Sequence, residues 1–107
     1  MTKSDKPLSK RELEKLEKNT IGWKLAAKNT KLVKTFEFEK HIDALIFIAR
    51  ITVHTELLHH HPDIQFTYCK AKITLTSHEQ KALTKKDLAL LSRIEKTHLK
   101  LSQVDNA

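Results

Sequence analysis

The apolar residues of this chain follow two periods, and the shorter period outlines β-strands. Successive side chains of a strand point to opposite faces, so alternating apolar and polar residues predict a half-buried strand. This pattern predicts strands at residues 23–27, 31–38, 64–69 and 72–76. A polar turn, Lys28-Asn29-Thr30, separates the first two strands. We therefore expect two antiparallel hairpins.

The longer period outlines three helices. Ser9 is a candidate N-cap with Glu12 three residues later, which is capping-box spacing at the start of a short first helix. The central helix is predicted from about residue 39 or 40 to residue 59 or 60. Thr84 and Asp87 repeat the capping-box spacing before a last helix, which we expect to end near residue 101.

The central helix carries a wide apolar surface. One stripe recurs at three- and four-residue spacing and consists of Ile42, Leu45, Ile46, Ala49, Val53 and Leu57. The surface is widened by Phe47, Ile48, Ile51 and Leu58. A stripe of this width can cover a sheet and also contact a second element. We interpret it as hydrophobic core and not as a cofactor site.

The predicted order of elements is α-β-β-α-β-β-α. Helices need a sheet face to bury against, so we expect an α+β fold with a four-stranded, mainly antiparallel sheet and three helices on one face. The other sheet face would then be half exposed, and a free edge strand favours a homo-oligomer, either a dimer or a tetramer. We expect one domain over residues 1–107, with flexible ends at 1–7 and 102–107.

The small number of glycines and cysteines excludes several classes of protein. A single glycine, Gly22, cannot form the Gly-rich loop of a P-loop or dinucleotide-binding enzyme. A single cysteine, Cys69, excludes an intrachain disulfide and a multi-cysteine zinc site, and it fits a reducing compartment. The polar N-terminus has no secretory pattern, and the longest apolar run, residues 44–49, is too short to span a membrane. We expect a cytoplasmic protein.

The formal net charge of +7 raises the question of a nucleic-acid partner. The lysines are scattered along the whole chain and form no dense basic run. A solvated, lysine-rich surface is therefore favoured over nucleic-acid binding, which would weaken steeply with salt.

Histidines gather where elements are predicted to end. His59, His60 and His61 close the central helix before Pro62, and His78 follows the fourth strand. Histidine exchanges a proton near neutral pH, with an ordinary pKa of about 6.5, and the negative end of a helix favours a protonated imidazole. This pattern is compatible with acid–base chemistry, with a metal site, or with a polar helix cap that has no chemical role. His41 and His98 are expected on the surface. His54 lies six residues before His60 and could share its side of the helix, but this spacing is weak evidence for a joint role.

The spacing of these residues resembles the pterin-4a-carbinolamine dehydratase family. The pattern is Glu56, three residues, His60-His61-Pro62, five residues, Tyr68, nine residues, His78, eight residues and Asp87. Flanking segments that also resemble the family are Gly22-Trp23, Phe36-Glu37-Phe38, 73–79 and 83–88. The chain departs from the family's pattern at Ile64, where an aromatic residue is common, and at Lys81-Ala82, where glycine is usual.

The resemblance implies an enzyme that dehydrates 4a-hydroxytetrahydropterin to quinonoid dihydropterin. The product regenerates the pterin cofactor of aromatic amino acid hydroxylases, and the reaction needs no metal or other cofactor. The catalytic residues carried over are His60, His61 and His78. His60 and His78 would transfer protons, and His61 would orient the pterin ring. Glu56 and Asp87 would bind substrate or orient a histidine, with Glu56 one helical turn before His60.

Three other functions compete with this reading. Adjacent His60 and His61 point about 100° apart on a helix, so a zinc site would need His78 and Cys69 to converge with one of them. The resemblance also allows a non-catalytic dimerisation module for a regulatory protein, and a nucleic-acid module is the remaining class. The complete set of histidines favours the enzyme, because an interaction module does not require it.

Overall fold

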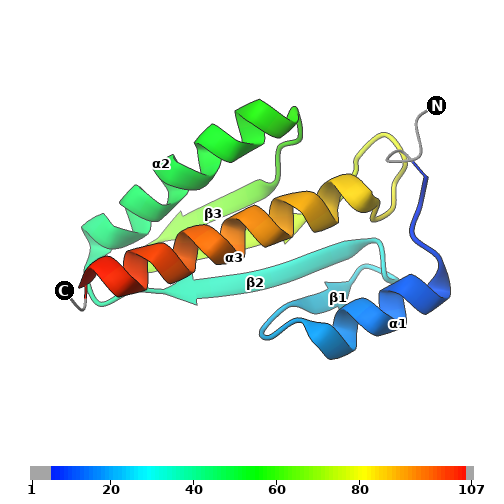
Figure 1. Cartoon of the computed structure of the whole chain (residues 1–107), viewed down its shortest axis with the longest axis horizontal. Helices are drawn as coiled ribbons and strands as arrows, with labels where there is room; N and C mark the ends of the chain where they lie inside the picture. Colours follow the sequence, from blue (N-terminus) through cyan, green and yellow to red (C-terminus); the bar gives the residue numbers. More distant parts are fainter. Residues whose placement is uncertain (1–5, 106–107) are drawn as a thin grey trace.

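A computed structural model describes residues 6–105, with side chains described up to residue 101. The predicted order of three helices and four strands is confirmed (Figure 1). The elements are α1 (Lys10–Asn19), β1 (Lys24–Ala26), β2 (Lys31–Glu37), α2 (His41–Leu58), β3 (Asp63–Thr67), β4 (Lys70–Leu75) and α3 (Lys85–Asp105). The last helix thus continues beyond residue 101. The remaining parts of the expected flexible ends, residues 1–5 and 106–107, lie outside the described residues.

The four strands form one sheet in the order β1-β2-β4-β3, and all three pairings are antiparallel. The two predicted hairpins meet in the centre, where β2 pairs with β4 from Leu32↔Leu75 to Glu37↔Lys70. The β3–β4 register places Asp63 opposite Thr74, so the start of β3 lies beside the end of β4. This register brings two of the segments that flank the candidate site together.

The helix ends follow from local side-chain chemistry. At α1, the Glu12 N–H donates to Ser9 Oγ and the Ser9 N–H donates to Glu12 Oε1, each at 3.2 Å, which confirms the predicted capping box. At the end of α2, His59 adopts a left-handed conformation with a φ of 52°. The chain therefore leaves the helical path before His60, and Pro62 prevents the helix from resuming.

The core lies between the sheet and the helices. Its fully or almost fully buried side chains come from β2, β4, α2 and α3 and include Leu32, Phe36, Phe47, Ile51, Ile73, Leu75, Leu90 and Ile94. α1 lies at the β1 end of the sheet, and its Leu13 and Leu16 pack against the same core (Figure 1). Burial of these apolar groups is the main stabilising term of the fold.

His98 is not the surface residue that the sequence predicts. Its ring is half-buried and lies 4.9 Å from the ring of Phe36 and 5.7 Å from that of Phe38, measured between centroids. Because the surrounding aromatic rings exclude water, desolvation lowers the pKa of His98, and Lys34 adds to this effect while Glu95 opposes it. His41, in contrast, is exposed, as expected.

The stripe predicted as core on α2 is exposed in the single chain. The residues that α2 buries, where it packs against the sheet and α3, are Ala44, Phe47, Ile51 and Thr55. The opposite apolar face contains Ile42, Leu45, Ile46, Ala49, Val53 and Leu57, which we call the α2 outer face. Val53 is 58% exposed and Leu57 is 68% exposed. The helix therefore has two apolar faces, and the sheet covers only one of them.

In the described part of the chain, no helix has both the length and the apolar character needed to cross a membrane.

Candidate active site

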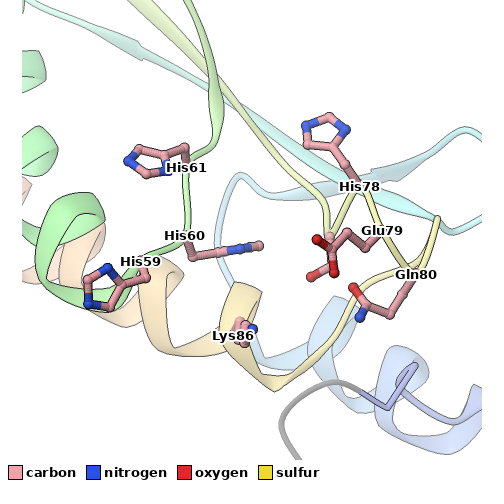
Figure 2. Close-up of a pocket in the computed structure, with 8 residues that line it drawn as sticks. His59, His60, His61, His78, Glu79, Gln80 and Lys86 are labelled. Carbon is pink, nitrogen blue, oxygen red and sulfur yellow. The ribbon is translucent and has the colours of Figure 1, made fainter. Parts of the chain in front are cut away.

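Three element ends meet at a pocket of about 230 Å³: the end of α2, the loop after β4 and the start of α3. Its lining consists of His59, His60, His61, Ser77, His78, Glu79, Gln80 and Lys86. Figure 2 shows His60 directed toward the loop that carries His78, while the rings of His59 and His61 project to the other side of the chain. The pocket thus brings together the three histidines that the sequence singled out.

His60 is held by a buried carboxylate. Its Nε2 lies 2.6 Å from Asp87 Oδ1, and the side chains of His60 and Asp87 are 11% and 0% exposed. Because a carboxylate only accepts, Nε2 carries the hydrogen and donates it to Asp87. This leaves Nδ1 as the imidazole nitrogen that can exchange a proton.

The second oxygen of Asp87 is bound from two sides. The Ser77 hydroxyl and the Thr84 N–H both donate to Oδ2, each at 2.9 Å. Since Ser77 gives its hydrogen to Asp87, the Thr84 hydroxyl donates to Ser77 Oγ at 2.7 Å. Asp87 also lies in the first turn of α3, where the helix dipole favours negative charge. The network fixes both the position and the orientation of the carboxylate that holds His60.

His61 is paired with Glu56. Its Nε2 lies 3.0 Å from Glu56 Oε1, and both side chains are mostly exposed. The sequence reading placed Glu56 beside His60, because it assumed a helix that continued to that residue. The left-handed turn at His59 moves His60 toward α3 and leaves His61 within reach of Glu56.

His78 has an acidic neighbour that sequence reasoning missed. Its Nε2 lies 3.7 Å from Asp63 Oδ2, with both side chains about two-thirds exposed. Asp63 directly follows Pro62, but only the β3–β4 register brings it to His78. Ser77 was missed for a similar reason, since its contact with Asp87 depends on how the loop folds over α3. The Thr84 N–H, in contrast, donates to Asp87 as their capping-box spacing predicts.

The loop that presents His78 is closed by backbone hydrogen bonds. The Ser77 N–H donates to the Ala82 carbonyl at 3.0 Å, and Lys81 adopts a left-handed conformation with a φ of 51°. That conformation is the one that favours glycine, so Lys81 carries local strain at the position where the family's pattern usually has glycine. His78 is therefore held on a short, constrained turn.

The arrangement can transfer protons between a ligand and imidazole rings. Each of His60, His61 and His78 lies beside a carboxylate, which can orient the imidazole ring. The carboxylates differ in burial, so His60 is rigid and the other two rings are free to adjust. Among the described residues, no group of three or more His, Cys, Asp or Glu side chains is arranged to hold a metal ion.

Comparison with known proteins identifies the family of this chain. Residues 6–97 match the family model described as pterin 4 alpha carbinolamine dehydratase. A protein of Nostoc sp. that is named for this family is 36% identical over 87 residues, covering 81% of this chain and 91% of the relative. The chain therefore belongs to the pterin 4 alpha carbinolamine dehydratase family.

Two solved structures share the fold. A transcriptional coactivator/pterin dehydratase from Brucella melitensis superimposes with a TM-score of 0.81 at 22% identity, covering 86% of this chain and 98% of that chain. A pterin dehydratase-like protein, described as a RuBisCO assembly factor in the alpha-carboxysome, gives a TM-score of 0.62 at 23% identity, covering 71% and 88%. At these identities the likeness concerns the fold.

Proposed function

We propose that this protein dehydrates 4a-hydroxytetrahydropterin to quinonoid dihydropterin by acid–base catalysis. The observation that carries the proposal is the pairing of His60 with the buried Asp87 in a pocket that also contains His61 and His78. The pairing defines one imidazole with a fixed tautomer and an available Nδ1, which is what a proton-transfer group needs.

The chemistry of the reaction requires two proton transfers. The N5 lone pair expels the hydroxyl group from C4a, and because hydroxide is a poor leaving group, an acid protonates it so that it leaves as water. A base then takes a proton from the resulting cation. We assign these steps to His60 and His78 and the orientation of the pterin ring to His61. Each transfer contributes about 10²–10⁴-fold to the rate.

His60 and His78 differ in ways that suit two separate steps. His60 is 11% exposed and its Nε2 is engaged with Asp87, so its proton exchange takes place at Nδ1 inside the site. The side chain of His78 is 64% exposed and can exchange a proton with water between turnovers. Either ring can serve as the acid or as the base.

The test is a stopped-flow assay in which a pterin-dependent hydroxylase generates the 4a-carbinolamine in situ. Absorbance then follows its dehydration with and without this protein. We expect the decay of the carbinolamine to accelerate in proportion to the protein concentration. An unchanged decay with correctly folded protein would contradict the proposal.

In a cell, this activity would recycle the pterin cofactor of an aromatic amino acid hydroxylase. The natural setting we infer is the cytoplasm, because the single Cys69 suits a reducing compartment.

A second function is favoured by the α2 outer face. Six aliphatic side chains exposed along one helix face form the kind of surface that binds another protein. We propose that a second copy of this chain covers it, giving a homo-oligomer, because a single helix face can pair with itself about a two-fold axis. A non-catalytic interaction module for a regulatory protein would use the same face. Catalysis depends on His60, whereas binding of another protein to the α2 outer face does not.

A further inference from the structure

A second concave site lies between α2 and α3, away from the histidine pocket. The two helices run in opposite directions and contact one another (Figure 1). The site is a groove of about 450 Å³ lined by Arg50, Val53, His54, Arg93, Lys96, Thr97 and Lys100, which we call the cationic groove. It shares no lining residue with the candidate active site, whose residues come from the end of α2, the loop after β4 and the start of α3.

The charge of the groove has a single sign. Two arginines and two lysines line it, and the lining contains no acidic side chain. In the part of the chain whose side chains are described, none of these four cations forms an ion pair, although the exposed Lys70 does, with Glu37. The folded chain thus gathers cations that are dispersed in the sequence and leaves them without counter-charges.

His54 adds a polar ring to the wall of the groove. Its Nδ1 is buried and has no hydrogen-bond partner among the described residues. Native proteins usually satisfy a buried polar atom with a hydrogen bond, because leaving it unpaired is costly. His54 lies one helical turn after Arg50 and lines the same groove.

We propose that the cationic groove binds a compact oligophosphate anion. Arginine guanidinium groups match phosphate oxygens in bidentate fashion, and lysines supply additional positive charge. Four cations around one groove complement the concentrated charge of linked phosphate groups better than the separate single charges of an acidic peptide. A nucleic acid fits less well, because no aromatic side chain lines the groove to stack on a base.

The experiment is isothermal titration calorimetry with tripolyphosphate as the probe, on the full chain. ATP is titrated in parallel, to distinguish a free oligophosphate from one carried by a nucleoside. We expect saturable binding by the wild type that weakens about tenfold or more in the double variant Arg50→Gln and Arg93→Gln, because charge-assisted hydrogen bonds are lost. The matched control is Arg11→Gln with Lys24→Gln, which removes the same charge from α1 and β1.

Two results would overturn the proposal. Equal weakening in the groove variant and the control would show a diffuse charge effect, and binding to duplex DNA without binding to tripolyphosphate or ATP would indicate a nucleic-acid surface. Circular dichroism checks that each variant is folded. If the arginine variant unfolds, the exposed pair Lys96→Gln and Lys100→Gln replaces it, with the same expected weakening. The dehydration assay is independent of either outcome.

Discussion

His60 Nε2 lies 2.6 Å from Asp87 Oδ1, and the Asp87 carboxylate is completely buried. The other two histidine–carboxylate pairs of the site are exposed, at 3.0 Å for His61 with Glu56 and 3.7 Å for His78 with Asp63. The buried pair resists screening by solvent, whereas exposed pairs contribute little to stability. Of the three imidazoles, His60 is therefore the one whose position and tautomer the fold determines.

Replacing the buried carboxylate should damage both activity and stability. In Asp87→Asn, the amide keeps the shape but loses the charge and one acceptor, so His60 is no longer held in a single tautomer. We expect kcat for carbinolamine dehydration to fall about tenfold to a hundredfold, with a smaller change in KM. Steady-state kinetics combined with a pH–rate profile separates this positioning role from a general loss of folded protein.

The matched control for that variant is Glu56→Gln. It makes the same chemical change in an exposed histidine–carboxylate pair, so the free energy of unfolding should change by less than about 1 kcal/mol. An Asp87→Asn enzyme with wild-type kcat would contradict the role assigned to the buried pair.

The hydroxyl of Ser77 should stabilise the folded chain through Asp87. Ser77→Ala removes one donor to the carboxylate and leaves the Thr84 hydroxyl without its acceptor inside the protein. We expect the free energy of unfolding in urea to decrease by about 1–3 kcal/mol. The exposed Ser92→Ala in α3 should change it by less than about 0.5 kcal/mol. Equal effects of the two alanine variants would show that the network is not stabilising.

Stability should decrease in mild acid because of His98. Its pKa is lower in the folded chain than in the unfolded chain, mainly through desolvation, so the unfolded state takes up the proton first as pH falls. The contribution of neutral His98 is fully present above about pH 6.5 and is lost as pH decreases from there toward the folded-state pKa. In His98→Phe this loss should be absent.

Thermal unfolding between pH 7.5 and 5.5 measures this effect. The difference in Tm between His98→Phe and the wild type should grow in favour of the variant as pH decreases. A difference that stays constant across this range would show that His98 does not contribute to the acid sensitivity.

The α2 outer face should determine the state of association. Leu45→Glu places a charge on this apolar face, so a homo-oligomer built on it should dissociate. Leu99→Glu, on α3, is the control, because Leu99 is also an exposed leucine but lies outside this face. Sedimentation velocity should show an oligomer for the wild type and the control and a monomer for Leu45→Glu. A monomeric wild type would contradict the proposal that a second copy of the chain covers the α2 outer face.

Local signals in the sequence predicted the fold well, since the Ser9–Glu12 capping box depends on neighbouring residues alone. The orientation of α2 was not predictable in this way. Its apolar residues form two faces, and periodicity does not say which face meets the sheet. The buried face proved to be the one with Phe47 and Ile51, and the stripe that includes Val53 proved to be outside.

The candidate site was likewise predictable only in part from local sequence signals. His60, His61 and His78 are brought to one pocket, as their positions at element ends suggested. The carboxylate partners were harder to assign, because Asp63 reaches His78 only through the β3–β4 register and Glu56 meets His61 only because the helix ends at His59. These contacts depend on tertiary structure and on one left-handed residue, which a reading along the chain does not resolve.

The most direct test of the proposed function compares two neighbouring histidines in the stopped-flow dehydration assay. His60→Gln removes the buried imidazole, whereas His59→Asn changes an exposed one and retains a residue that tolerates the left-handed conformation. The account predicts that the wild type and His59→Asn accelerate dehydration and that His60→Gln loses about 10²-fold or more of this rate. Equal acceleration by both variants, or none by the folded wild type, would contradict it.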